Sequence, residues 1–412
     1  MGKYLAELEA AGVESEFGEN TDRALGADVI VVSPGVPSDA PVIKRAVEKA
    51  LPVVSEVEVA SWFTKSDIIA VTGTNGKTTT TTLIGRMLAD ARIPSTTGGN
   101  IGVAFSEIVN ELTPQSKVVL EISSFQLDTS VLFRPRVSVL LNITPDHLDR
   151  YENQFEKYVA SKCKIFEHQS HGDTLVYNAD DEVVRREVEQ RVPHGVRLLP
   201  FSASTSVASG AFEDRGMMKL CTSGETTDVV AVRDLSIKGR HNLYNAMAAT
   251  LASHTAGASI ASLRATLKNF KGVEHRLEFV REHEGVSYVN DSKATNVDSV
   301  WYALQSFEKP LVVLMGGRDK GNDYEPLVPL VRKNVRGIVA MGESAGKVVE
   351  AFRNVVQVKE ADSMQKAVAT ASTMASRGDV VLLSPACASF DWFENYEHRG
   401  KVFKEEVLKL GS

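Results

Sequence analysis

Short apolar runs, each followed by a polar or glycine-rich loop, recur along this chain, and apolar residues at helical spacing follow most of them. The clearest example is the run 68–71, whose four apolar residues predict a short buried strand. A glycine-rich turn over 72–76 follows it, and helical spacing then recurs at Leu83, Ile84, Met87, Leu88 and Ala91. Strand, turn and helix in this order predict an α/β unit around which the chain is organised.

The same pattern predicts further strands on both sides of this unit. In the first half of the chain they are 28–32, 52–54, 118–122, 137–143 and 173–178. In the last third they are 286–290, 311–315, 337–341 and 379–383, and helices alternate with them. This alternation predicts a mostly parallel sheet with helices on both faces, whose polar loops meet at one edge and form a ligand site.

Helices are expected over 4–11, 41–50 and 153–166, and a long alanine-rich helix is expected to open at 239–245. Residues 97–102 predict a second glycine-rich turn. The stretch 195–236 is rich in Ser, Thr and Gly, and we expect it to form a small antiparallel sheet without a chemical role.

A length of 412 residues predicts two or three domains, and a composition of 43% hydrophobic and 24% charged residues indicates a globular protein. We expect domains over 1–54, 55–272 and 273–412. The net charge of −7 argues against a nucleic-acid partner. The three cysteines lie far apart and offer no zinc spacing or disulfide framework, which is typical of a cytoplasmic protein. No signal peptide or membrane-spanning run is found, so no membrane association is expected.

The turn Gly73-x-x-Gly76-Lys77-Thr78 predicts a phosphate-binding loop. Its glycines let backbone N–H groups approach an anion, Lys77 would bridge the outer phosphates, and the Thr78 hydroxyl would bind magnesium. The spacing is shorter than that of the standard loop, which has a glycine where this chain has Val71. An ordinary strand-to-helix turn with a surface lysine is therefore the alternative.

Other polar residues follow predicted strands at the same sheet edge. Glu121 ends an apolar strand, where it could bind magnesium, although a surface glutamate is the plain alternative. His147 lies in the loop after 137–143, where a metal or phosphate could lie, although a lone histidine is usually structural. By default we expect solvated side chains at the lysines of the next helix, Lys157, Lys162 and Lys164.

Taken together, these motifs resemble the Mur ligases, the ATP-dependent amide-forming enzymes of peptidoglycan synthesis. The motifs that carry the resemblance are 73–78, 98–102, 121–127, 146–150, 241–242, 290–296 and 384–391, with Glu397-x-Arg399-Gly400. The strings Ser-Ser-Phe-Gln-Leu at 123–127, Ser-Lys-Ala-Thr-Asn at 292–296 and Ser-Pro-Ala-Cys-Ala-Ser at 384–389 are most similar to the D-glutamate-adding member.

The resemblance implies a role for each candidate residue. The ATP phosphates would be held by Gly73, Thr74, Asn75, Gly76, Lys77, Thr78, Thr79 and Thr80, and the rest of the nucleotide by Asn242, Asn245, Arg276 and Asp291. One magnesium ion would be bound by Thr78 and Glu121, and a second by His147 and a carbamylated Lys162. The UDP-sugar would contact Asn100, and D-glutamate would contact Thr295, Lys320, Ser389 and Tyr396. Further substrate-binding candidates are Ser123, His147 and Phe390, and the catalytic set would be Lys77, Glu121, His147 and Lys162.

The fold implied is the three-domain α/β Mur ligase architecture: a partial UDP-substrate domain, a central P-loop domain and a C-terminal Rossmann-like domain. The implied reaction is ATP-dependent, joins D-glutamate to UDP-N-acetylmuramoyl-L-alanine through an acyl phosphate, and takes place in the cytoplasm on a monomer. The family's N-terminal domain normally opens with a strand, a glycine-rich turn, a helix and a second strand. This chain starts after them, so we expect a truncated start and weak binding of the UDP-sugar.

Two rival functions stay open. The first is a sister ligase that adds another amino acid, although the Asp-Asn-Pro-Arg string of the diaminopimelate-adding enzymes is not found in this chain. The second is a nucleotide-binding protein that senses or scaffolds without ligating. The presence of Glu121, His147 and Lys162 argues against the second rival.

Overall fold

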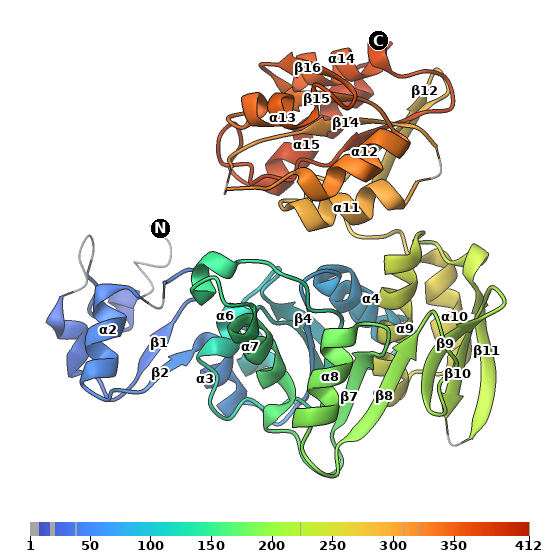
Figure 1. The fold of residues 1–412 in the computed structure, drawn as a ribbon. Coiled ribbons are helices and arrows are strands. Elements are labelled where there is room, and N and C mark those ends of the chain that lie inside the picture. The colour runs from blue at the N-terminus through green and yellow to red at the C-terminus, as the bar shows by residue number, and fades with distance from the viewer. Residues whose placement is uncertain are drawn as a thin grey trace. The chain divides into compact units, whose positions relative to one another are not determined.

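The computed structural model describes residues 8–16, 21–37, 39–222, 224–307, 309–319 and 321–411 (Figure 1). The chain forms two compact units. The first unit contains 1–212, 220–226 and 248–259, and the second contains 213–219, 227–247 and 260–412. In the described part of the chain, no helix has both the length and the apolar character that crossing a bilayer requires.

The chain begins with a two-stranded parallel sheet of β1 (Ile30–Val32) and β2 (Val53–Ser55), preceded by the 3₁₀ turn η1 (Asp22–Gly26) and joined by α2 (Pro41–Glu48). These elements confirm the predicted strands and helix. The prediction that the first strand is buried is wrong for Val31, which is 48% exposed, because Ile30 and Val32 alone face the small core under α2. Of the helix expected over 4–11, residues 4–7 lie outside the described residues, and 8–10 are helical.

A nine-stranded sheet, in the order β11-β10-β9-β8-β7-β6-β3-β5-β4, carries the phosphate-binding loop. Its strands are β3 (Asp67–Thr72), β4 (Ser95–Gly99), β5 (Lys117–Glu121), β6 (Val137–Leu140), β7 (Thr174–Asn178), β8 (Arg197–Ser202), β9 (Gly210–Asp214), β10 (Met217–Thr222) and β11 (Glu225–Ala231). The ladders from β4 to β9 are parallel. The loops after β3, β5 and β6 therefore leave the sheet at one edge, as predicted.

Two sequence-based predictions about this sheet are wrong. Residues 195–236 do not form a separate antiparallel sheet, since β8 pairs parallel with β7 and β9 pairs parallel with β8. For β7 and β8 the reason is that α8 (Glu182–Arg191) lies between them as the crossover helix that a parallel connection requires. The turn expected over 97–102 begins only at Asn100, because 97–99 are paired with β5 as part of β4.

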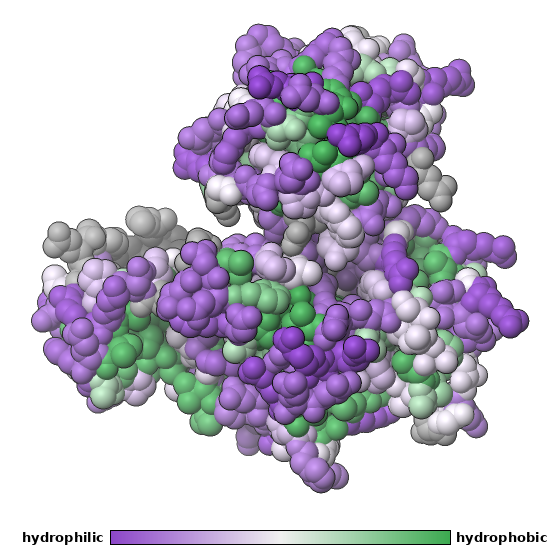
Figure 2. Space-filling view, in the orientation of Figure 1, coloured by the Kyte–Doolittle hydropathy of each residue, from purple (hydrophilic) through white to green (hydrophobic). Residues whose placement is uncertain are grey.

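The other helices that accompany this sheet are α3 (Glu56–Trp62), α4 (Lys77–Asp90), α5 (Phe105–Ile108), α6 (Ser124–Asp128), α7 (Phe155–Glu167), α9 (Arg240–Thr255) and α10 (Ile260–Asn269), with the 3₁₀ turns η2 (Val109–Glu111), η3 (Leu148–Tyr151) and η4 (Val232–Asp234). Of these helices, α4, α7 and α9 confirm predicted helices, whereas α5, α6 and α10 were not predicted. One large apolar cluster joins β3, β5 and β6 to α5, α7 and α8. Figure 2 shows a largely polar surface on which apolar side chains gather in small areas, for example over α2.

The second unit contains a six-stranded sheet in the order β12-β13-β17-β14-β15-β16. Its strands are β12 (Glu278–His283), β13 (Val286–Asn290), β14 (Leu311–Met315), β15 (Val335–Met341), β16 (Gln357–Ala361) and β17 (Val380–Leu383), and only β12 runs antiparallel. One face packs against α11 (Val297–Gln305), η5 (Glu325–Leu327), α12 (Val328–Asn334) and α13 (Ala345–Phe352), and the other against α14 (Met364–Met374) and α15 (Tyr396–Leu408). The mostly parallel sheet with helices on both faces is thus confirmed. The two edge strands β12 and β16 were not predicted.

Candidate active site

The phosphate-binding loop joins β3 to α4, and its backbone requires glycine at two positions. Gly76 precedes α4 with a φ of 84°, a conformation that side chains other than glycine rarely adopt. A Cβ on Gly73 would lie 2.9 Å from Cβ of Leu141, so a larger residue does not fit there. The Lys77 amine folds back over the turn and donates to the backbone oxygens of Gly73 and Thr74, both at 2.8 Å. Of the next threonines, Thr78 is half-buried, and Thr79 and Thr80 are buried.

Three residues from later in the chain hold this loop in place, two by their side chains and one by its backbone carbonyl. Asn142, just after β6, accepts from the Asn75 N–H at 2.8 Å and donates to the Asn75 carbonyl at 3.0 Å. The Thr74 hydroxyl donates to the Thr144 carbonyl and lies 3.1 Å from the Tyr158 hydroxyl. Sequence reasoning missed Asn142 and Tyr158. A signal existed for Asn142, which lies at a strand end beside polar residues.

Lys162 is buried on α7, with only 1% of its surface exposed, so its expected solvation is wrong. Its amine donates to the Gly73 carbonyl at 2.9 Å and lies 4.6 Å from the centre of the Tyr158 ring. Burial, together with the nearby charge of Lys77, lowers the pKa of Lys162 well below its usual value. An uncharged lysine amine is a nucleophile, so this residue is suited to react with carbon dioxide.

Glu121 ends β5 and is buried, with an exposure of 2%. One carboxylate oxygen, Oε1, accepts from the Asn100 side-chain amide at 2.9 Å. The other, Oε2, is buried and finds no hydrogen-bond partner among the described residues. Burying an unpartnered carboxylate oxygen is costly, and a hard cation such as Mg²⁺ is a ligand that removes this cost. The residues present therefore fit a magnesium ion at Glu121.

His147 and Ser123 have different local settings. His147 follows β6 in a left-handed conformation, its ring packs edge-on against Phe125 with centroids 5.1 Å apart, and Nε2 lies 3.7 Å from Asp146 Oδ2. The histidine side chain is 45% exposed. Ser123 caps α6, since its hydroxyl accepts from the Gln126 N–H, and Gln126 in turn accepts from the Ser123 N–H. These contacts are those of a helix cap.

In the second unit, Asn242 and Asn245 share one face of α9, and the Asn245 side-chain amide donates to Asn242 Oδ1 at 3.1 Å. Asn242 also donates to the Lys238 carbonyl. The neighbouring His241 is half-buried, and desolvation together with the charge of Arg276 lowers its pKa to about 4. His241 therefore stays neutral at physiological pH.

Asp291 lies at the carboxyl end of β13 and is almost completely buried. It accepts hydrogen bonds from the Ser384 hydroxyl at 2.9 Å and from the Leu277 N–H at 3.2 Å. Burial raises the pKa of Asp291 to about 6, although the positive charge of Arg276 opposes this shift. The chain around Arg276 is unusual, because the flanking residues His275 and Leu277 both have positive φ angles.

The candidate D-glutamate residues also follow strands of this sheet, in the loops after β13 and β17 and at the start of α15. Thr295 is half-buried and Ser389 is buried, whereas Phe390 is 61% exposed. The amine of Lys293 lies 5.2 Å from the centre of the Tyr396 ring. Lys320 lies outside the described residues.

Comparison with known proteins gives this arrangement a family. Residues 71–253 match the family described as the Mur ligase middle domain, and residues 275–387 match the Mur ligase, glutamate ligase domain. A UDP-N-acetylmuramoylalanine–D-glutamate ligase of Salinibacter ruber is 49% identical over 98% of this chain and 90% of its own length. The chain belongs to the Mur ligase family.

Two further comparisons agree with this. A UDP-N-acetylmuramoylalanine–D-glutamate ligase of Chloroherpeton thalassium is 45% identical to this Mur ligase over 98% of the chain and 90% of its own length. The solved structure of the MurF ligase from Thermotoga maritima in complex with ADP has a TM-score of 0.63 at 20% identity, covering 94% of this chain and 91% of that one. The resemblance inferred from the motifs, and the Mur ligase architecture it implied, are confirmed.

The sequence motif that contains Arg399 was recognised in this Mur ligase, but no role was assigned to Arg399 itself. It lies on α15 and is buried. Its guanidinium donates to the Ser292 hydroxyl and carbonyl at 3.0 and 2.8 Å, and to the carbonyls of Cys387 and Ala388 at 3.1 and 3.2 Å. Arg399 thus ties the loop after β13 to the loop after β17, which carry Thr295 and Ser389.

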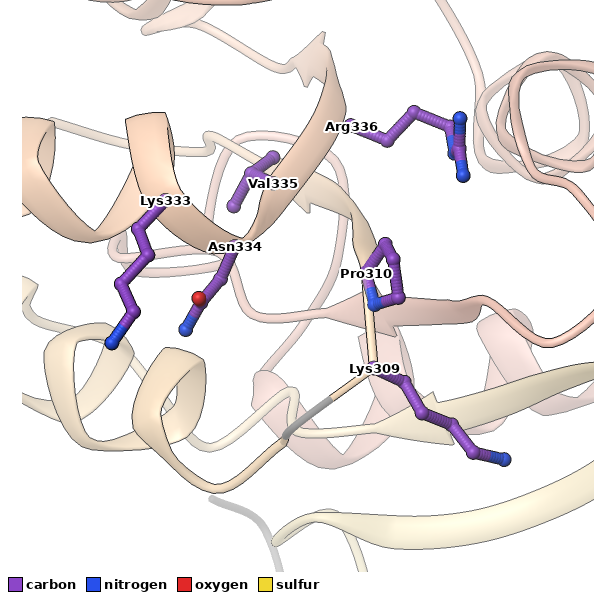
Figure 3. A pocket seen from close by; sticks show the side chains of 6 residues that line it. All are labelled: Lys309, Pro310, Lys333, Asn334, Val335 and Arg336. Atoms are coloured by element: carbon purple, nitrogen blue, oxygen red, sulfur yellow. The ribbon is translucent and has the colours of Figure 1, made fainter.

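A separate cavity of about 260 Å³ lies where β14 and β15 begin, at the opposite end of these strands from the candidate D-glutamate residues. It is lined by Lys309, Pro310, Lys333, Asn334, Val335 and Arg336 (Figure 3). Lys333 and Arg336 point away from one another, and Arg336 is held by Asp379 at 2.6 Å. Because its cationic groups do not converge, we assign no ligand to this cavity.

Proposed function

We propose that this Mur ligase joins D-glutamate to UDP-N-acetylmuramoyl-L-alanine, with ATP converted to ADP and phosphate. The substrate class is supported by the relatives from Salinibacter ruber and Chloroherpeton thalassium, which carry this activity in their names at 45–49% identity over nearly the whole chain. The use of ATP is supported by the loop at Gly73–Lys77 beside a buried carboxylate with one unpartnered oxygen, Glu121. This pairing is the structural observation that carries the proposal.

The reaction takes two steps. The substrate carboxylate attacks the γ-phosphorus of ATP, the bond from that phosphorus to ADP breaks, and an acyl phosphate forms. The amine of D-glutamate attacks the acyl carbon, the bond to phosphate breaks, and the nitrogen loses a proton. Phosphoryl transfer of this kind depends on positioning and charge stabilisation, which Lys77 and the N-terminus of α4 provide at the phosphates.

Magnesium would neutralise charge on the phosphoryl oxygens when bound. We assign one magnesium site to Thr78 and Glu121 and a second to His147 and Lys162. Lys162 would act there as a carbamate, which replaces a cation with a carboxylate-like ligand. The support for this is its burial and its lowered pKa, both of which favour the neutral amine.

The remaining assignments extend the same proposal. Residues 1–54, 55–272 and 273–412 act as the UDP-substrate, ATP and amino-acid domains. Asn242, Asn245, Arg276 and Asp291 bind the nucleotide, and Asn100 contacts the UDP-sugar. D-Glutamate is held by Thr295, Lys320, Ser389 and Tyr396, with Phe390 and Ser123 as further substrate contacts. The enzyme works as a cytoplasmic monomer.

Phosphate release from ATP tests the proposal. UDP-N-acetylmuramoyl-L-alanine is supplied, and D-glutamate, L-glutamate, L-alanine or a diamino acid is added in turn. Release with D-glutamate alone is the expected result. Release with another amino acid would make the chain a sister ligase. No phosphate release with any of the amino acids, while ATP still binds in calorimetry, would favour a nucleotide-binding protein that does not ligate.

A further inference from the structure

Arg150 connects two parts of the first unit that lie far apart in sequence. It belongs to η3, three residues after His147. Its guanidinium donates to the carbonyl of Pro34 at 2.9 Å and to the carbonyl of Val36 at 3.3 Å. Both carbonyls lie in the loop that follows β1, at the carboxyl end of a parallel strand, where α/β sheets bind ligands.

The same guanidinium also stacks on an aromatic ring beside the candidate metal site. Its central carbon lies 3.9 Å from the centre of the Phe125 ring. The Phe125 ring in turn packs against His147, with centroids 5.1 Å apart, and against Tyr151, at 6.4 Å. Arg150 therefore bridges the loop 33–37, helix α6 and the loop that carries His147.

These contacts depend on the chemistry of arginine. A planar guanidinium can donate to two carbonyls while one face lies on an aromatic ring, whereas a lysine amine is a single point charge that cannot do all three. Among the described residues, no carboxylate lies within ion-pair distance of Arg150. The guanidinium is therefore directed at backbone carbonyls. An arginine that served only in surface ion pairs would face a carboxylate instead.

We propose that Arg150 is a positioning residue, which fixes the loop 33–37 against the His147 loop so that the UDP-linked substrate presents its carboxylate to the phosphate-binding loop. The proposal rests on the proposed function and extends it to a residue that does not itself touch the reacting atoms. A loop that is fixed before binding loses less entropy when the substrate binds. The interaction therefore acts on the UDP-linked substrate and leaves ATP and D-glutamate unaffected.

The test compares Arg150→Met and Arg150→Lys with the wild-type chain in steady-state kinetics. Arg150→Met keeps the length of the stem but removes the donors, and Arg150→Lys keeps the charge without the fork. We expect KM for UDP-N-acetylmuramoyl-L-alanine to rise roughly 10- to 100-fold in Arg150→Met, as loss of two charge-assisted hydrogen bonds implies. Arg150→Lys restores little of this loss, and KM for ATP and for D-glutamate stays within about twofold of the wild type. Arg185→Met, an exposed arginine of α8 in the same unit, is the matched control and behaves as the wild type.

Two further measurements separate positioning from general damage. Guanidinium ions added to Arg150→Ala should lower the KM of the UDP-linked substrate again, because they occupy the vacated site. Hydrogen exchange without substrate should be faster at the Val36 amide, which donates to Ser33 within the tethered loop, while amides of β3 are unchanged. An unchanged KM, an equal rise for all three substrates, or unchanged exchange at Val36 would overturn the proposal. Because exchange needs no turnover, it tests the tether even if the wild type releases no phosphate, an outcome that would overturn the proposed function instead.

Discussion

The amines of Lys77 and Lys162 donate to the same backbone oxygen, that of Gly73, at 2.8 and 2.9 Å. Because both amines donate to one oxygen, two ammonium groups would lie close together here and repel each other. Lys162 is also buried. Both effects lower the pKa of Lys162, with burial the larger. The surroundings of Lys162 thus favour its neutral amine, whereas Lys77 is half-buried at the start of α4.

Lys162→Ala is expected to lower the rate of phosphate release at least roughly 100-fold, because under the proposed function it removes the carbamate that would bind the metal at the reacting phosphates. If the active form is a carbamate, short carboxylates such as acetate should restore part of the rate by occupying the same place. The measurement is phosphate release with and without acetate. Lys157→Ala is the control, since Lys157 lies on the same helix but is half-exposed and paired with Glu152. Full activity of Lys162→Ala would remove this residue from the mechanism, and a loss without rescue would remove the carbamate.

Glu121→Gln is expected to raise the magnesium concentration needed for half-maximal phosphate release by roughly 10- to 100-fold. The reason is that the substitution removes the negative charge of the carboxylate whose Oε2 has no partner among the described residues, and puts an amide group in its place. The thermal midpoint should not fall, because the substitution removes a buried charge and retains an acceptor for Asn100. Magnesium titrations of the variant and of Glu107→Gln, an exposed glutamate of α5, provide the comparison. Superimposable titration curves would show that Glu121 does not bind the metal.

The fold could be predicted where the sequence pattern is local. The strand at 68–71 and the helix after it were found because their apolar periodicity does not depend on distant residues. The edge strands β12 and β16 were missed, since Glu278–His283 and Gln357–Ala361 are rich in charged residues and are half-exposed. Such strands are defined by the sheet beside them, and their own composition gives little signal.

The candidate site could likewise be predicted only where its residues are close together in the sequence. The glycine and lysine positions of the phosphate-binding loop could be identified because they are contiguous. Asn142 lies 67 residues from the Asn75 that it holds, and Arg150 lies 116 residues from Pro34, so no local pattern connects them. Burial of Lys162 had a signal that was overlooked, because Tyr158 and Val159 lie four and three residues before it and place it on the apolar face of α7.

Asp291→Asn is expected to make the chain more stable at pH 8 and to bring no such gain at pH 4. In the folded chain the pKa of this carboxyl is raised from an ordinary 3.8 to about 6. The protonated carboxyl therefore contributes stability below pH 3.8, and this contribution is lost as the pH rises through about 6. This pKa shift corresponds to a loss of about 3 kcal/mol in the free energy of unfolding once the carboxyl is fully ionised. Denaturant unfolding of variant and wild type from pH 4 to pH 8 measures it.

Asp362→Asn is the control for this prediction, because its carboxyl is exposed, is paired with Lys366, and has a pKa that is lowered. Its unfolding should show no gain in stability at high pH. If Asp291 binds the nucleotide, Asp291→Asn should also bind ATP more weakly in calorimetry while being more stable. A difference in unfolding free energy that does not vary with pH would show that folding does not raise the pKa of Asp291.

Arg399→Met is expected to destabilise the second unit by about 3 kcal/mol or more, since it removes the side-chain donor to the buried carbonyls of Ser292 and Cys387 and leaves the Ala388 carbonyl with the Arg318 N–H alone. Arg399→Lys keeps a charge but supplies fewer donors in a site where burial already lowers the pKa of the arginine to about 10. The lysine variant should therefore fold but hold the two loops less firmly. Because these loops carry Thr295 and Ser389, we expect KM for D-glutamate to rise several-fold while KM for ATP changes little. Lys401→Met, an exposed position on the same helix, should match the wild type in both KM values. If Arg399→Lys raised the two KM values equally, the clamp would be serving the stability of the unit and not the amino-acid site.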